Sequence, residues 1–172
     1  QIGFFVNTLA LRDTVQGDMP FASVLTSVRA TATEAFEHQL YPFDQLVDEL
    51  PLRRDLSRSP LFDVMVVLQN PDSARLEMGD VTVTQVPVGF QVSKFDITFN
   101  FAENEAGLSG EIEYNTDLFV EDRIRRMADH FQTLAASVIE EPERTVDNLD
   151  ILPEWERNLL LYGFNDNARP FP

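Results

Sequence analysis

Apolar side chains recur along this chain at two spacings, one typical of helices and one typical of strands. Spacings of three and four residues predict two long amphipathic helices, the first beginning after Asp18 and the second after Asp117. Each aspartate is expected to act as the N-cap of its helix. Shorter stretches with the same spacing predict two further helices. The four predicted helices cover residues 18–38, 43–50, 117–142 and 154–162.

Strict alternation of apolar and polar residues marks two strands, over residues 95–101 and 108–114. The loop 104–107 between them predicts an antiparallel pair. An almost continuous apolar run over residues 62–68 predicts a central strand, and residues 2–12 predict another interior strand. A weaker strand over 81–88 carries a proline, which favours an edge or crossing position.

This order of elements predicts an α/β fold, in the form of an α+β two-layer sandwich. About five strands form a mixed sheet and three or four helices pack on it. The length of 172 residues suits one ordinary domain with a core of its own. The chain starts in an apolar run and ends in a proline-rich segment, so both ends are interpreted as cuts inside a longer polypeptide.

The net charge of the chain makes some classes of binding partner unfavourable. The chain has 29 acidic and 13 basic residues and a net charge of −16, which disfavours nucleic acid and anionic membrane surfaces. No apolar run has the length that a bilayer requires. Cysteine is absent, which excludes disulfides and thiolate metal sites and fits a cytoplasmic protein.

Neither histidine has the sequence context of a catalytic residue. His38 ends the first long helix, where it could act as a general base or simply interact with the helix dipole. His130 lies inside the last long helix, and no second His or Cys at metal-ligand spacing accompanies it. We expect His130 to be a solvated or packing residue, and we predict no metal site.

Two other places concentrate polar chemistry. Arg54, Asp55, Ser57 and Arg58 precede the predicted central strand. They predict either a structural ion pair or the electrostatic support of a site, since a buried unpaired charge is costly. Asn7 interrupts an interior strand, so it either hydrogen-bonds neighbouring backbone or lines a polar cavity.

Ordered sequence blocks resemble the C-terminal half of a condensation domain from nonribosomal peptide synthetases. Residues 2–12 resemble the family's I-G-x-F-V-N-T-L block, and residues 38–44 its H-Q-x-Y-P-F-E block with Asp44 in place of Glu. Residues 54–62 resemble R-D-x-S-R-N-P-L-F, with Ser59 where Asn is usual. Residues 94–97 and 159–166 resemble a late strand and the linker to an adenylation domain.

The resemblance implies a lobe of a chloramphenicol-acetyltransferase-like fold, whose two lobes enclose a tunnel. Residues 1–152 would form the acceptor-side lobe and residues 153–172 the linker toward an adenylation domain. The family joins aminoacyl or peptidyl thioesters held on the phosphopantetheine arms of carrier proteins, as in antibiotic and secondary-metabolite synthesis. The implied partners are therefore the N-terminal lobe, peptidyl carrier proteins and an adenylation domain. No cofactor would bind this chain directly.

The resemblance also implies supporting roles for four residues and a catalytic role for none. The family's H-H-x-x-x-D-G motif is absent, so the chain is expected to be an inactive part of an amide-bond-forming acyltransferase. Asn7, Arg58 and Ser59 would lie near the tunnel, with Asp55 beside them. They would orient substrate, stabilise an oxyanion or hold the lobe interface. A non-catalytic docking module and a lobe of an epimerising relative remain as alternatives.

Overall fold

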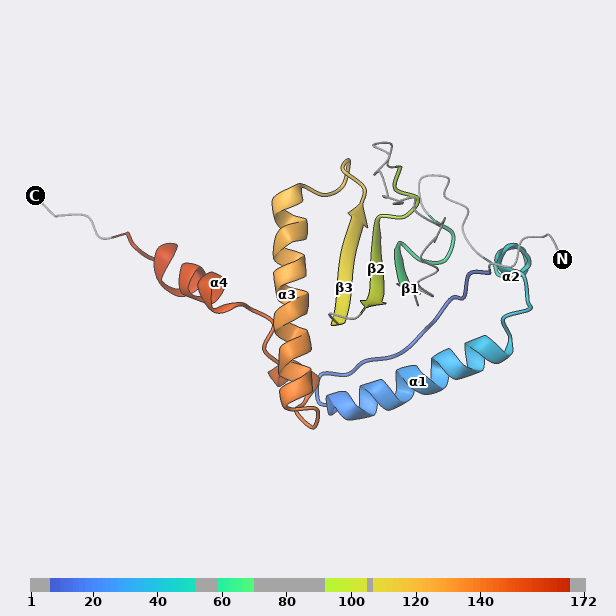
Figure 1. The fold of residues 1–172 in the computed structure, drawn as a ribbon, viewed down its shortest axis with the longest axis horizontal. Helices are drawn as coiled ribbons and strands as arrows, with labels where there is room; N and C mark the ends of the chain where they lie inside the picture. The colour runs from blue at the N-terminus through green and yellow to red at the C-terminus, as the bar shows by residue number, and fades with distance from the viewer. Residues whose placement is uncertain (1–6, 52–58, 70–91, 105–106, 168–172) are drawn as a thin grey trace, which may run out of the picture. The chain divides into compact units, whose positions relative to one another are not determined.

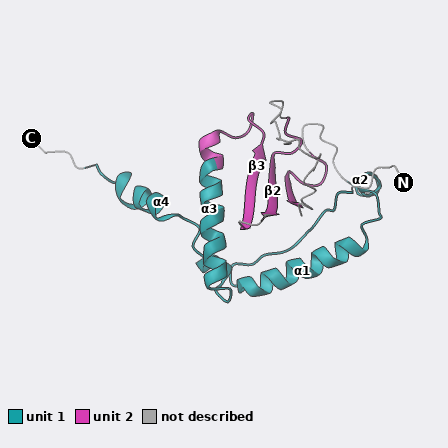
Figure 2. Ribbon diagram, in the orientation of Figure 1, with its two compact units in different colours: residues 1–51, 125–172 teal, residues 52–124 magenta. Residues whose placement is uncertain are grey.

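The computed structural model describes residues 7–51, 59–69, 92–104 and 107–167 (Figure 1). The chain divides into two compact units, one of residues 1–51 with 125–172 and the other of residues 52–124 (Figure 2). Each unit is described by itself.

The first unit is helical. Its elements are α1 Phe21–Glu37, α2 Phe43–Glu49, most of α3 Glu121–Glu140, the 3-10 turn η1 Val146–Asn148, α4 Glu154–Asn158 and the π-helical turn η2 Leu159–Gly163. These helices confirm the four predicted from the apolar spacing, with small shifts at their ends.

The start of α1 is capped by backbone from a distant part of the sequence. The N–H groups of Phe21 and Ala22 donate to the carbonyl oxygens of Arg144 and Pro142, at 3.0 and 2.8 Å. Pro20 occupies the N-cap position and makes no side-chain capping bond. The prediction that Asp18 is the N-cap is therefore wrong, because the segment after α3 already satisfies these donors.

The same two segments run side by side just before α1. Pro20 and Thr145 form an isolated antiparallel bridge. The N–H of Val146 donates to the carbonyl of Met19, and the N–H of Asp147 donates to the carbonyl of Gly17. The Asp147 carboxylate lies directly over the Cα of Gly17. The segment after α3 is thus held to the segment before α1.

Residues 7–16 have no regular secondary structure, so the predicted strand over 2–12 is wrong for its described part. Side-chain bonds replace a strand ladder here. The Asp13 carboxylate accepts hydrogen bonds from Thr31 at 2.7 Å and Ser27 at 3.4 Å. These two hydroxyls are four residues apart on α1 and face the same side. Residues 1–6 lie outside the described residues.

The second unit contains a mixed sheet of three described strands in the order β1-β2-β3. They are β1 Val64–Gln69, β2 Ile97–Asn104 and β3 Gly107–Tyr114. β1 is parallel to β2, and β2 is antiparallel to β3, which confirms the predicted mixed sheet and hairpin. Gly107 enters β3 with φ at +123°, a conformation that favours glycine.

The described sheet has fewer strands than the predicted five. Residues 7–12 are irregular, and the predicted strand over 81–88 lies outside the described residues. β1 was predicted to be central, yet in the described sheet it has a strand neighbour on one side only, β2.

The pleat of β2 and β3 places most of their apolar side chains on one face and most of their polar side chains on the other, whereas β1 is apolar on both faces. Registered positions share a face, and the face that carries Ile97 and Phe99 of β2 is apolar. The rings of Phe99 and Phe101 are stacked with centroids 6.4 Å apart, and Phe101 lies against Gly110 of β3. The opposite face carries Thr98 and polar groups of its neighbours. The apolar face is completed by Val64, Val66, Leu68, Ile112 and Tyr114, and the polar face includes Asn100, Ser109, Glu111 and Glu113.

A turn precedes α3. The carbonyl of Asn115 accepts the N–H groups of Leu118 and Phe119, and its side-chain oxygen accepts the N–H of Asp117. The helix therefore begins at Glu121, and the prediction of Asp117 as its N-cap is wrong. Glu121 and Asp122 occupy the first turn as predicted, where they complement the helix dipole. No helix among the described residues has the length and apolar character to cross a membrane.

Gly17 tests the pairing between the segments before α1 and after α3. A Cβ added at Gly17 would overlap the carboxylate of Asp147. Because the Asp147 carboxylate is exposed and must move aside, we expect Gly17→Ala to lower the free energy of unfolding by about 0.5–1 kcal/mol, measured by chemical denaturation. In an Asp147→Ala background the same change should cost clearly less, since the clashing atoms are gone. Equal costs in both backgrounds would contradict this packing.

Candidate functional site

The side chain of Asn7 uses its full hydrogen-bonding capacity on backbone. Its Nδ2 donates to the carbonyl oxygens of Gln39 at 2.7 Å and Tyr41 at 2.8 Å. Its Oδ1 accepts the N–H of Thr8 at 3.0 Å and the N–H of Phe43 at 3.3 Å. An amide offers two donors and two acceptor lone pairs, so all four are occupied.

Three of these four bonds join the first sequence block to the second, and the fourth, from Thr8, lies within the first block. Phe43 is the first residue of α2, and Pro42 before it makes no side-chain capping bond. Asn7 therefore supplies from a distance the acceptor that an N-cap side chain would give. Of the two interpretations of Asn7 open from sequence, the structure shows the one in which it satisfies neighbouring backbone.

The second block forms a bend between α1 and α2. His38 is the C-cap residue of α1, where its N–H donates to the carbonyls of Glu34 and Ala35 and its side chain is exposed. The Tyr41 hydroxyl donates a hydrogen bond to the carboxylate of Glu49 at the end of α2, which raises the pKa of Tyr41. His38 is thus placed as a helix-terminal residue.

The third block meets the Lys94–Ile97 block where the parallel strands begin. The carbonyl of Asp63 accepts the N–H groups of Asp96 at 3.1 Å and Ile97 at 3.3 Å. The rings of Phe62 and Phe95 lie 5.4 Å apart. These contacts hold the two blocks side by side within the second unit.

The four candidate residues are distributed unevenly over the described structure. Ser59 is half-buried and immediately precedes Pro60. Arg58 and Asp55 lie outside the described residues, as does most of the segment 79–93 that was expected to cross to another lobe. Asn7 belongs to the first unit and Ser59 to the second.

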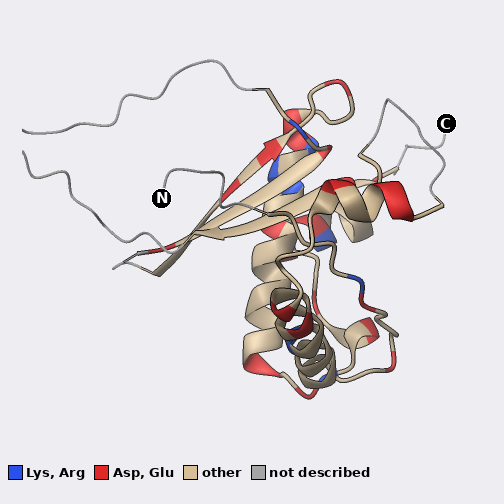
Figure 3. Cartoon of the chain, turned by 90° about the vertical axis from the view of Figure 1, so that its right-hand side faces the viewer, with Lys and Arg blue, Asp and Glu red and all other residues tan. Residues whose placement is uncertain are grey.

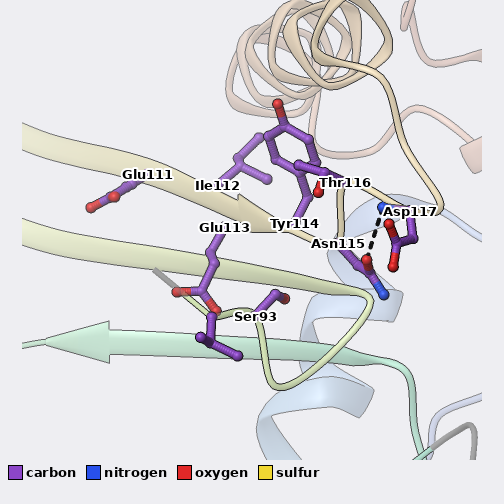
Figure 4. Close-up of a pocket in the computed structure, with 9 residues that line it drawn as sticks. Ser93, Glu111, Ile112, Glu113, Tyr114, Asn115, Thr116 and Asp117 are labelled. Atoms are coloured by element: carbon purple, nitrogen blue, oxygen red, sulfur yellow. Dashed lines mark hydrogen bonds between the residues drawn. The ribbon is translucent and has the colours of Figure 1, made fainter. Parts of the chain in front are cut away.

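A pocket of about 490 Å³ opens beside the end of β3 (Figure 4). Glu111, Glu113 and Asp117 contribute carboxylates to its lining, and Ser93 contributes a hydroxyl that also donates to the carbonyl of Phe95. The lining accepts hydrogen bonds more readily than it donates them. Asp and Glu are spread over elements of both units, however (Figure 3). Within the described ranges, no group of three or more acidic or histidine side chains could hold a metal ion.

A sequence model of the condensation domain matches residues 1–161. The chain belongs to the condensation-domain family. The match confirms the resemblance carried by the ordered sequence blocks.

The relatives of this condensation-domain chain are much longer proteins. It is 41% identical over 171 aligned residues to bacitracin synthase 3 of Bacillus licheniformis, which covers 99% of this chain and 3% of the relative. It is 40% identical over 171 residues to tyrocidine synthase 3 of Brevibacillus parabrevis, again over 99% of this chain and 3% of the relative. The chain thus spans a small fraction of the curated relatives it matches.

Solved structures with the same fold include two kinds of protein. One is a four-domain nonribosomal peptide synthetase bound to AMP and glycine, with a TM-score of 0.75 and 25% identity over 90% of this chain and 13% of that one. The other is the X-domain in complex with OxyB from teicoplanin biosynthesis, with a TM-score of 0.71 and 26% identity over 84% of this chain and 32% of that one.

One charged contact in this condensation-domain chain was missed from sequence. His130 of α3 contacts the carboxylate of Glu156 in α4, a buried residue. His130 was expected to be solvated or to pack, and the structure gives it an acidic partner. Glu156 stands in a charged stretch between Glu154 and Arg157, and nothing in that local pattern distinguishes it from a solvent-facing residue.

Asn7→Asp tests the three hydrogen bonds by which Asn7 joins the first two blocks. Aspartate keeps the acceptors but loses both donors, and it sets a carboxylate against two carbonyl oxygens. We expect the free energy of unfolding to fall by about 2 kcal/mol, measured by urea denaturation. The amide of Phe43, which Oδ1 still accepts, should remain better protected from hydrogen exchange in Asn7→Asp than in Asn7→Ala. An Asn7→Asp variant as stable as the original would refute this role.

Proposed function

We propose that this chain is the acceptor-side lobe of a condensation domain that forms peptide bonds between carrier-bound aminoacyl or peptidyl thioesters. The upstream thioester carbonyl is attacked by the amine of the downstream aminoacyl group, the C–S bond breaks, and an amide bond forms. The observation that carries the proposal is the combination of a family match over residues 1–161 with the absence of the paired-histidine motif.

In this proposal the two lobes have different roles in the reaction. The general base that positions or deprotonates the attacking amine belongs to the lobe with the paired histidines, so this lobe is inactive alone. The residues of this lobe support the reaction and do not provide the base. Asn7 acts by holding the second block in place, since its amide is fully occupied by backbone. Arg58, Ser59 and Asp55 support the tunnel or the lobe interface.

Exposed apolar side chains support a role in contact with another lobe. Val64, Val66 and Leu68 lie at alternate positions of β1 and are 49%, 64% and 64% exposed. They share one face of the strand, where they form a continuous apolar stripe. Stripes of this kind are typical of surfaces that become covered on association.

The proposed partners follow from the synthetase relatives. They are the N-terminal lobe, peptidyl carrier proteins that bring the phosphopantetheine arms, and an adenylation domain joined through residues 153–172. Residues 1–152 form the lobe in this division. The synthesis takes place in the cytoplasm, and the phosphopantetheine arm belongs to the carrier proteins.

Reconstitution of the two lobes tests the function directly. We expect no condensation product from this chain alone with two loaded carrier proteins. Product should appear when a separately produced N-terminal lobe with the paired histidines is added. It should be detected by mass spectrometry after cleavage of the thioester that holds it on the downstream carrier.

The matched control replaces the second histidine of the added lobe by alanine. It should abolish product while leaving the complex of the two lobes intact in size-exclusion chromatography. A complex that forms without any product, even with the intact histidine motif, would count against peptide-bond formation.

A second function is favoured by one comparison. The X-domain from teicoplanin biosynthesis, which has the same fold, has been solved in complex with OxyB. A condensation-type lobe that serves as a non-catalytic docking module would bind carrier proteins without promoting condensation. The reconstitution above separates the two functions, because the docking module gives the complex and no product.

Arg58 tests the proposed support of the tunnel. In the complete enzyme, we expect Arg58→Ala to lower condensation kcat/KM by about tenfold or more, since the proposal assigns its guanidinium a supporting role at the tunnel or the lobe interface. Arg58→Lys keeps the charge but not the planar fork of donors, and it should recover part of the rate only if charge is what matters. Unchanged turnover and unchanged melting temperature in Arg58→Ala would remove Arg58 from the site.

A further inference from the structure

Glu156 is the buried charge of the last helical segment. It lies in the first turn of α4 and is 8% exposed, while Trp155 beside it is 48% exposed and Tyr162 further along is 70% exposed. A carboxylate removed from water costs several kcal/mol unless it is paired. The Glu156 carboxylate therefore needs partners that compensate for its removal from water.

Those partners are two basic side chains one turn apart on α3. The Nε2 of His130 contacts one carboxylate oxygen of Glu156, and the Nη1 of Arg126 lies 4.0 Å from the other oxygen. Positions 126 and 130 are four residues apart and face the same side of the helix. Each oxygen of Glu156 thus has its own partner, and both partners belong to α3.

The segment that carries Glu156 has little stability of its own. α4 spans five residues and continues directly into the π-helical turn η2. Pro153 at the N-cap provides no side-chain capping bond. A helix of this length is marginal in water without tertiary contacts, so its attachment to α3 decides whether it stays folded.

We propose that Glu156 anchors a releasable latch, in which His130 and Arg126 hold the segment 154–163 on α3. Loss of the charge pair frees this segment while the rest of the first unit stays folded. Because residue 164 follows directly on the end of η2, the latch also sets the direction in which the chain continues.

Glu154 provides a matched control for the anchor. It lies in the same helical turn, carries the same charge and is exposed. Glu156→Gln and Glu154→Gln therefore remove the same charge from the same helix, but only the first removes it from the latch.

Trp155 reports on the latch because it is the single tryptophan of the chain. In the full 172-residue chain, Glu156→Gln should shift its fluorescence to longer wavelength. Amides in 157–164 should exchange about tenfold faster or more, with those of α1 unchanged. His130→Gln should do the same, and Glu154→Gln should do neither. The exchanged pair, His130→Glu with Glu156→His, should restore the emission and exchange of Arg126→Gln when made in that background, since it recreates the contact without placing an imidazole beside Arg126.

Two results would overturn the latch. One is a Glu156→Gln variant that behaves like Glu154→Gln in both measurements. The other is an equal rise in exchange for α1 and the 157–164 segment in both Glu156→Gln and His130→Gln, which would make the pair part of the general stability of the unit. A Glu156→Gln chain that fails to fold leaves His130→Gln and the exchanged pair to decide by the same criteria.

Discussion

The side-chain amide of Asn7 joins two parts of the first unit that are more than thirty residues apart in the sequence. Its donors hold the carbonyls on either side of Leu40, and its acceptor receives the N–H that opens α2. Among polar side chains of this length, the amide of asparagine is the group that offers two donors and two acceptor lone pairs. Serine is too short and has one donor, and aspartate has none. The bend between α1 and α2 therefore depends on the chemistry of this one residue.

A second junction is made almost entirely of backbone. The segment 17–22 pairs with the segment 142–147 through N–H to carbonyl bonds, and it caps α1 in doing so. Among the described residues, three apolar side chains count as buried, namely Val24, Ile97 and Ile124. Of these three, Val24 belongs to the first unit, so directional hydrogen bonds contribute much of what fixes the conformation there. Apolar surface left exposed is then available for association, in line with the partners that we propose for this chain.

The periodic parts of the chain were predictable because periodicity is a local property. The apolar spacing placed α1 and α3, and the alternation around Phe99 and Ile112 placed the hairpin. The predictions that failed depend on hydrogen bonds that the apolar spacing does not show. Asp18 and Asp117 look like N-caps, but backbone carbonyls after α3 occupy the first site and the Asn115 turn precedes the second.

The candidate site shows the same limit, because the contacts that decide the roles of its residues join positions distant in the sequence. From sequence, Asn7 had two interpretations, and only the positions of Gln39, Tyr41 and Phe43 distinguish them. Residues 2–12 resembled an interior strand because they are apolar on both faces, yet Asp13 fastens the described end of this stretch to α1 by side-chain bonds. His130 and Glu156 are 26 residues apart, and no local pattern links them.

The family resemblance implies an amide side chain at two positions, 7 and 59, and the described contacts around these positions differ. This chain has Asn7 at the first position and Ser59 at the second. The described contacts of the third block run through the carbonyl of Asp63 and the ring of Phe62, neither of which needs an amide at position 59. The second block, by contrast, forms three hydrogen bonds with the Asn7 side chain, through Gln39, Tyr41 and Phe43. The contacts named for the third block therefore do not involve the side chain at position 59, whereas those of the second block use both donors and the acceptor of Asn7.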